Sequence, residues 1–129
     1  MIAVDSSAIV AVLKSEPDTD RIYSALEIAG RSFISASNVL ELQLVLAEKR
    51  FLTGWEQIES LFATYSVAIK PFDERQLRIA REAAVMYGKG RHKAGLNFGD
   101  CFAYALAKAE GLPLLCTGND FAHTDVKIA

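Results

Sequence analysis

Four acidic side chains lie where metal-assisted chemistry would need them. Asp5 ends a short apolar segment, and Asp120 follows another within a few residues, whereas Glu41 and Asp100 lie near the beginnings of two longer apolar segments. A group of carboxylates repels itself and stays ionised at neutral pH only beside a cation. All-oxygen ligands favour Mg²⁺, or Mn²⁺ as an alternative, over zinc. Because a magnesium ion held by carboxylates typically polarises a phosphoryl oxygen and lowers the pKa of a bound water, the sequence predicts chemistry on a phosphate.

Each of these acids also has a purely structural interpretation. Asp5 can cap a helix, Asp120 can be a turn residue, and Asp100 can complete a reciprocal helix cap with Asn97. Glu41 is harder to explain in this way, because leucines flank it on a helix with little polar surface. A buried carboxylate without a partner costs several kcal/mol, so we expect either a cation beside Glu41 or a cleft that opens it to solvent.

Short apolar strands that alternate with helices are the elements expected to bring these acids together. The sequence predicts strands over residues 1–4, 31–34, 67–69 and 112–116, with a last edge strand at 126–128. It predicts helices over residues 6–13, 17–29, 35–50, 54–65, 74–87 and 98–110. This alternation indicates a single α/β domain over residues 1–129 with a mostly parallel sheet of about four to five strands. Ligands of such sheets bind beyond the carboxyl ends of the strands, so we expect the four acids at one edge.

Composition and charge narrow the possible locations and partners. The chain has 129 residues, of which 51% are hydrophobic and 23% charged, as in a soluble globular domain. Its 14 basic and 16 acidic residues give a net charge of −2, which excludes a strongly basic protein that coats nucleic acid. The longest apolar run, residues 101–107, is too short to cross a bilayer. Two cysteines make neither a disulfide framework nor a zinc site. We therefore expect a cytoplasmic protein with no membrane partner.

A glycine-rich basic loop over residues 88–95 precedes Asp100. Its side chains Lys89, Arg91 and Lys93 are either ordinary solvated residues or a phosphate clamp beside the carboxylates. The second interpretation predicts RNA binding by this loop, because neutralisation of the phosphate backbone supplies most of the non-specific affinity for nucleic acid.

Four segments resemble the motifs of the PIN domain, and within that family the chain is similar to the VapC toxins of bacterial toxin–antitoxin pairs. The motifs read IAVDSSAI at residues 2–9, SNVLE at 37–41, NFGDCFAYALA at 97–107 and LLCTGNDF at 114–121. They occur in the family's order along the whole chain, and the third is the most specific. The resemblance implies a three-layer PIN-like fold with helices on both faces of the sheet.

The resemblance also implies an activity and its partners. The expected activity is that of a Mg²⁺-dependent endoribonuclease, the toxin of the pair, which hydrolyses RNA phosphodiester bonds with a metal-activated water. The expected partners are tRNA or rRNA as substrate, a small VapB-like antitoxin whose tail enters the active site, and a second copy of the chain in a homodimer. In-line attack would leave a 5′-phosphate and a 3′-hydroxyl.

The family's invariant acids fall on Asp5, Glu41 and Asp100. By this resemblance Asp5 and Asp100 bind the metal directly. Glu41 either completes the metal site or accepts a proton from the attacking water. Asp5→Asn or Asp100→Asn is expected to abolish cleavage while the fold persists.

The last motif departs from the family's pattern at its fourth acid. That acid usually lies two residues after the threonine, but here Asn119 follows Thr117 at this spacing, with Asp120 next to it. Either Asn119 contributes a neutral oxygen or Asp120 substitutes as the fourth catalytic acid. Ser6 and Thr117 are expected to hydrogen-bond the metal-bound waters or the phosphate.

Two other functions compete with this one. A non-catalytic, receiver-like regulatory module would also bind Mg²⁺ in an acidic pocket, but the chain lacks the lysine that such modules carry on their last long strand. A phosphatase with an aspartyl nucleophile would need a second aspartate two residues after the first, and Ser7 occupies that position after Asp5. Mg²⁺-dependent cleavage of structured RNA separates these three functions.

Overall fold

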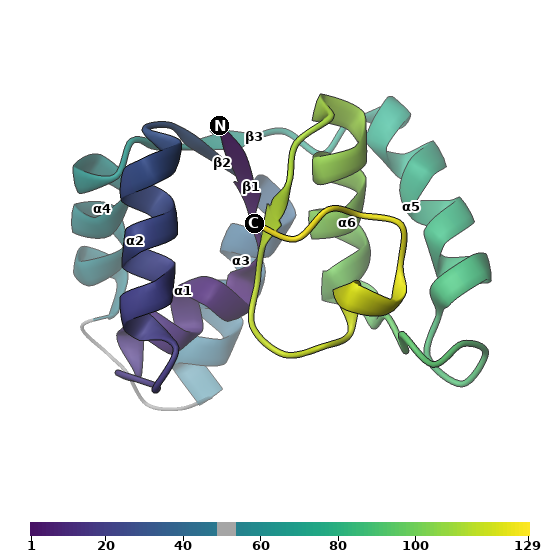
Figure 1. Ribbon diagram of the computed structural model, residues 1–129, viewed down its shortest axis with the longest axis horizontal. Helices are drawn as coiled ribbons and strands as arrows, with labels where there is room; N and C mark the ends of the chain where they lie inside the picture. Colours follow the sequence, from purple (N-terminus) through teal and green to yellow (C-terminus); the bar gives the residue numbers. More distant parts are fainter. Residues whose placement is uncertain (49–53) are drawn as a thin grey trace.

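A parallel sheet with the strand order β3-β2-β1-β4 forms the centre of the molecule (Figure 1). The computed structural model describes residues 1–48 and 54–129. The strands are Ile2–Val4 (β1), Ser32–Ser35 (β2), Val67–Lys70 (β3) and Leu114–Leu115 (β4). Strand β1 therefore pairs with β2 on one side and, on the other, with a strand from the far end of the chain. The predicted α/β fold with a parallel sheet is confirmed.

Helices cover both faces of this sheet (Figure 1). They are Ser6–Leu13 (α1), Thr19–Ala29 (α2), Ala36–Glu48 (α3), Gly54–Thr64 (α4), Glu74–Tyr87 (α5) and Phe98–Glu110 (α6). Successive strand residues point to opposite faces, so Ile2 and Val4 pack in the core formed with α1 to α4. Ala3 packs in the second core, formed with α5 and α6. The result is the predicted arrangement of three layers.

Some predicted boundaries differ from the structure. Helix α2 begins two residues after Pro17, and β4 is shorter than the predicted strand over residues 112–116. The predicted edge strand at 126–128 is wrong, because this segment forms only an isolated bridge between Ile128 and Leu114. Strand β4 is only two residues long, which leaves little ladder for a further strand to join. The predicted end of the third helix, near residue 50, lies outside the described residues.

The described helices also bear on the membrane prediction. None of those within residues 1–48 and 54–129 is long and apolar enough to cross a membrane.

Candidate functional site

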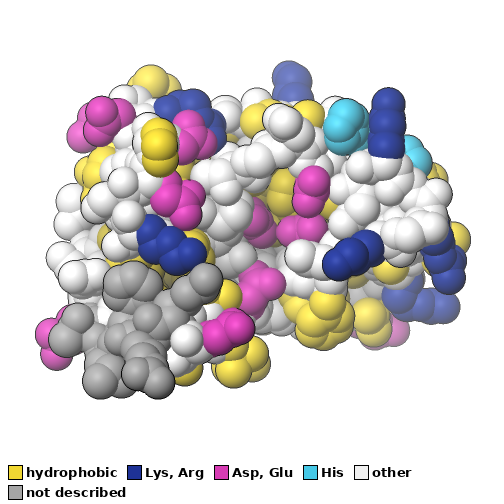
Figure 2. All heavy atoms as spheres, turned by 90° about the horizontal axis from the view of Figure 1, so that it is seen from below, with side chains coloured by type: hydrophobic (Ala, Val, Ile, Leu, Met, Phe, Trp, Pro, Cys, Tyr) yellow, Lys and Arg dark blue, Asp and Glu magenta, His cyan; other side chains and the backbone are white. Residues whose placement is uncertain are grey.

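The carboxyl ends of the parallel strands carry the residues that the sequence singled out. Asp5 directly follows β1, and the segment that contains Asp120 follows β4. Helix α3 begins directly after β2, and Glu41 lies in its second turn; Asp100 lies in the first turn of α6. In Figure 2, Asp and Glu side chains gather near the middle of the face seen from below, and Lys and Arg side chains lie toward both of its ends.

Asp5 is both a helix cap and a candidate ligand. Its Oδ2 accepts a hydrogen bond from the Ser7 N–H at 3.0 Å and caps α1. Its Oδ1 is buried and accepts no hydrogen bond from the described residues. The pKa of Asp5 is raised to about 7, chiefly by burial and, to a smaller extent, by the negative charges of Asp100 and Glu41, against the lowering effect of the Ser7 hydrogen bond. The predicted cap is confirmed, and it uses only one of the two carboxylate oxygens.

Asp100 combines the same two roles. Its Oδ2 accepts from the Asn97 N–H at 3.0 Å, and the Asn97 Oδ1 accepts from the Asp100 N–H at 2.9 Å. This is the predicted reciprocal cap. Burial is the main cause that raises the pKa of Asp100, and the charges of Asp120 and Glu41 add to it. The pKa shifts of Asp5 and Asp100 thus share the charge of Glu41 as a cause, so these acids lie within electrostatic reach of one another.

Glu41 is half-buried and finds its partners in two hydrogen-bond donors. Its Oε1 accepts from the Ser6 hydroxyl and, at 3.2 Å, from the Asn38 side-chain amide. The sequence predicted a cation or solvent beside this carboxylate and did not predict these donors. Ser6, expected to contact metal-bound water or phosphate, donates its hydroxyl hydrogen to Glu41, and its predicted contact stays a prediction. Asn38 lies three positions before Glu41, so the two residues share one face of the helix. This spacing could have indicated the hydrogen bond between them.

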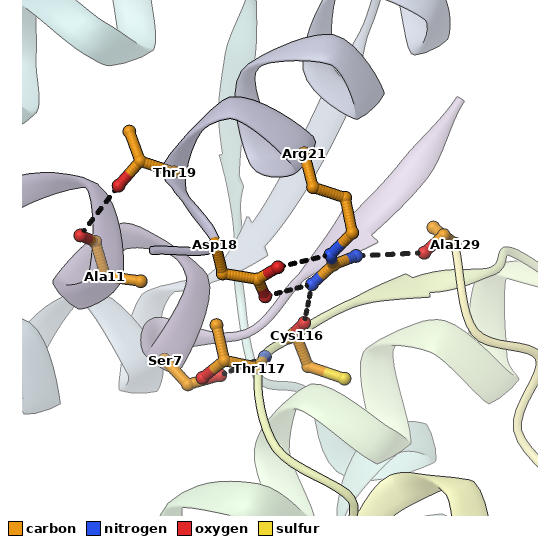
Figure 3. Close-up of polar contacts among 8 residues, drawn as sticks. All are labelled: Ser7, Ala11, Asp18, Thr19, Arg21, Cys116, Thr117 and Ala129. Atoms are coloured by element: carbon orange, nitrogen blue, oxygen red, sulfur yellow. Dashed lines mark hydrogen bonds and ion pairs between the residues drawn. The ribbon is translucent and has the colours of Figure 1, made fainter. Parts of the chain in front are cut away.

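The segment after β4 is tied to the beginning of α1. The Thr117 N–H donates to the Ser7 hydroxyl at 3.1 Å (Figure 3). Asp120 is exposed, and its charge raises the pKa of Asp100. Asp120 therefore lies within electrostatic reach of Asp100. Asn119 is exposed as well, and its side chain makes no hydrogen bond to the described residues.

Arg21 contacts the backbone directly after β4. The sequence did not predict this contact. Its guanidinium donates to both Asp18 carboxylate oxygens at 2.8 and 2.6 Å and to the Cys116 carbonyl oxygen at 2.7 Å (Figure 3). It also reaches the Ala129 carbonyl oxygen at 3.5 Å. The three-residue spacing of Asp18 and Arg21 indicates a helical ion pair, but nothing local to it indicates a contact with β4.

The basic loop lies beside the beginning of α6. Lys89 and Arg91 line an open hollow of about 460 Å³ together with Asn97 and Phe98. Lys93 is exposed and is not among the residues that line this hollow. Among the described residues, none of the three pairs with a carboxylate. Their charges are therefore free to meet an external anion.

The donor set fits a hard divalent cation. In the described parts of the chain, no three His, Cys, Asp or Glu side chains are placed closely enough to form a metal-binding group. Asp5 nevertheless holds a buried oxygen with no donor among residues 1–48 and 54–129, and the charges of neighbouring carboxylates disfavour its ionised form. A divalent cation relieves both costs, and oxygen ligands suit Mg²⁺ or Mn²⁺. Asp5, Asp100 and Glu41 are the residues that would hold it.

Comparisons with known proteins agree on one family. The family model described as PIN domain matches residues 2–127. Ribonuclease VapC30 of Mycobacterium tuberculosis is 41% identical over 125 residues, which are 97% of this chain and 95% of that protein. The structure of VapC20 of M. tuberculosis, described as a sarcin-ricin loop cleaving toxin, aligns with a TM-score of 0.78 at 14% identity and covers 100% of this chain and 98% of its own. VapBC2 from Rickettsia felis, bound to a promoter DNA fragment, also aligns with a TM-score of 0.78, at 18% identity, and covers 99% and 96%.

Proposed function

Because this chain belongs to the PIN domain family and, within it, to the VapC ribonucleases, we propose that it is a metal-dependent endoribonuclease, the toxin of a toxin–antitoxin pair. The observation that carries this proposal is the mutual electrostatic influence of three sequence-distant acids at one sheet edge, together with a buried Asp5 oxygen that has no hydrogen-bond partner among the described residues. The relatives named as ribonucleases cover nearly the whole chain, which supports the same activity for it.

Each side chain of the site has its own proposed role in phosphodiester hydrolysis. A divalent ion at this site supplies charge stabilisation at the phosphate and lowers the pKa of a water. We assign Asp5 and Asp100 to hold the ion through the oxygens that their capping bonds leave free. Glu41 completes the ion's ligands or accepts the proton of the attacking water, and the Ser6 and Asn38 donors orient it for either role.

The fourth position belongs, in this proposal, to Asp120 rather than to Asn119. Its charge acts on Asp100, so it lies within electrostatic reach of the other acids. Asp120 would orient the attacking water at the open side of the site. In-line attack then leaves a 5′-phosphate and a 3′-hydroxyl on the RNA.

The partners are proposed from the family to which the chain belongs. We propose tRNA or rRNA as the substrate, a small VapB-like antitoxin as the inhibitor and a homodimer as the assembly, in the cytoplasm where these RNAs are found. Exposed apolar side chains on α3 and α5 support contact with another protein, because apolar groups of this size are usually covered when they gather on a surface. They are Leu40, Leu44, Val85 and Met86.

The decisive test is cleavage of a panel of structured RNAs that includes tRNAs and ribosomal RNA hairpins. The protein with Mg²⁺ or Mn²⁺ is expected to cut at least one of them and leave a 5′-phosphate end, which ligation of a reporter oligonucleotide detects. The control is Asp100→Asn, expected to bind but not to cut. Absence of cleavage by the unaltered protein, or full activity of the variant, would contradict the proposal. Ion binding without any cleavage would instead favour the regulatory module.

The basic loop is expected to bind the RNA backbone. Changing Lys89, Arg91 and Lys93 together to alanine should weaken RNA binding and reduce the magnitude of its salt dependence. Each lost phosphate contact reduces the magnitude of the negative slope of log K against log salt by about 0.7 for single-stranded RNA. Fluorescence anisotropy of a labelled RNA, measured with the Asp100→Asn protein so that no cleavage occurs, gives both quantities.

A charge-matched variant controls for the loss of net charge. Arg31 and Lys127 lie at the amino ends of β2 and β4, away from the acids, and Arg78 is exposed on α5. Changing these three to alanine removes the same charge and should leave the salt slope nearly unchanged. Equal slopes for the two triple variants would show that the loop is not a specific phosphate contact.

A further inference from the structure

Asn38 joins two parts of the candidate site that are far apart in the sequence. It lies in the first turn of α3 and is completely buried. Its Nδ2 donates to the Glu41 Oε1 at 3.2 Å and to the Gly99 carbonyl oxygen at 3.0 Å. Gly99 precedes Asp100 in α6. One amide group therefore contacts both the acid on α3 and the backbone beside the acid on α6.

Gly99 contributes to the same arrangement from the opposite side. A Cβ atom at this position would overlap the carboxylate of Glu41, and Oε2 would be its nearest neighbour. The absence of a side chain at residue 99 thus leaves the space that this carboxylate fills. Gly99 is buried in α6, where a glycine otherwise lowers helix stability by about 1 kcal/mol relative to alanine. The close approach of Glu41 explains why a glycine lies here.

The chemistry of the neighbours specifies an amide at residue 38. The Glu41 carboxylate and the Gly99 carbonyl are both acceptors, and an asparagine NH₂ has two N–H bonds, one for each. An aspartate of the same size would place acceptors against acceptors. A leucine would fill similar space but leave both acceptors without this donor, at the cost of buried polar groups.

We propose that Asn38 and Gly99 are positioning residues that hold the Glu41 carboxylate in its working orientation. Asn38 and Ser6 hold Oε1, and the space at Gly99, next to Asp100 in the sequence, accommodates Oε2. Neither residue contacts the substrate; both act through Glu41. The inference rests on the proposed function, because it assigns Glu41 a part in cleavage. A displacement of about 1 Å in a catalytic group can lower the rate about 100-fold.

The first test is Asn38→Leu. The kcat for RNA cleavage is expected to fall about 10- to 100-fold while KM changes less than about 2-fold. A crystal structure of the variant is expected to show the Glu41 carboxylate moved away from the Ser6 hydroxyl. An unmoved carboxylate, or an unchanged kcat, would overturn the inference. The structural readout remains informative even if the unaltered protein cleaves no RNA, so failure of the proposed function is distinguishable.

A double-mutant cycle separates action through Glu41 from action through α6. If Asn38 works only through this carboxylate, Asn38→Leu should change single-turnover cleavage less than about 2-fold in a Glu41→Gln background. Losses that multiply in the double variant would mean that Asn38 acts through Gly99 and Asp100 instead, and would overturn the assignment. If Glu41→Gln alone leaves no measurable cleavage, the crystal structure of the single variant decides.

Gly99→Ala and a matched buried amide complete the design. Gly99→Ala should lower kcat as Asn38→Leu does, because the added methyl group displaces the carboxylate while helix propensity improves. Gln76 is the control: it is buried and its Nε2 donates to the Pro71 carbonyl oxygen at 3.1 Å, far from the acids in the fold. Gln76→Met should lower the melting temperature about as much as Asn38→Leu but leave kcat unchanged. Equal losses of kcat in Asn38→Leu and Gln76→Met would show that Asn38 only stabilises the fold and does not position Glu41.

Discussion

Asp5→Asn is expected to lower RNA cleavage by about 10³-fold or more and, at neutral pH without divalent ions, to make the protein more stable. Loss of cleavage follows because a neutral amide holds a divalent cation far less well than a carboxylate, and such a cation stabilises the reacting phosphate by several kcal/mol. The helix cap survives, because asparagine is as good an N-cap as aspartate. The fold therefore persists while the activity disappears.

The gain in stability follows from the direction of the pKa shift. Burial raises the pKa of Asp5 from 3.8 to about 7. Between these two values the folded chain binds more protons at this residue than the unfolded chain, so the free energy of unfolding falls as pH rises. Asparagine does not titrate, so the free energy of unfolding of the variant does not fall with pH for this reason. At pH 8 it should be more stable than the unaltered protein by at most about 4 kcal/mol, and at pH 4 the difference should nearly vanish.

Urea unfolding from pH 4 to 8 in the presence of a chelator measures this effect. The quantity to follow is the difference between the two proteins, in which the titrations of the remaining acids largely cancel. Asp120→Asn is the matched control, because this acid is exposed and its removal should give a small difference across the range. A variant at residue 5 that is less stable than the unaltered protein at pH 8 would contradict the burial argument.

Removal of divalent ions should abolish cleavage completely. With excess EDTA, carboxylates at the sheet edge have no counter-charge, and the free oxygen of Asp5 has no partner. Added Mg²⁺ or Mn²⁺ should restore the activity. It should also raise the melting temperature, because a ligand at 100 times its Kd stabilises the folded state by about 2.7 kcal/mol.

The thermal shift separates ion binding from RNA cleavage. Asp5→Asn should lose most of the shift caused by Mg²⁺, whereas Gln76→Met should retain it, because Gln76 is not a ligand. Differential scanning fluorimetry at several Mg²⁺ concentrations gives the comparison. Cleavage at its full rate in excess EDTA would contradict metal dependence directly.

Local patterns accounted for most of the fold and for the acids themselves. Asp5 and Asp100 were recognisable because an acid beside a helix beginning is a short-range signal, and the structure has both as caps. The alternation of apolar strands and helices was sufficient to predict a parallel sheet with helices on both faces. Binding by Lys89 and its neighbours, and the choice between Asn119 and Asp120, stay predictions.

Contacts between distant segments were beyond the reach of these patterns. Asn38 contacts Gly99, and Arg21 contacts Cys116, and neither pair has a periodicity or spacing that links its members. The edge strand predicted at 126–128 failed for a related reason. Val126 packs in the second core, and the pairing of this segment with β4 is limited to the single bridge between Ile128 and Leu114. Such features depend on which elements meet in space, which the order of residues alone does not specify.

The position of β1 has a consequence for the time at which the protein becomes active. Strand β1 lies inside the sheet and obtains one of its two neighbours, β4, only when residues 114–115 emerge from the ribosome. Asp100 and the start of α6 also arrive late. A partly synthesised chain therefore cannot assemble the acids, however stable its first half becomes. For a ribonuclease toxin, this order delays assembly of the site until residues 114–115 have been translated.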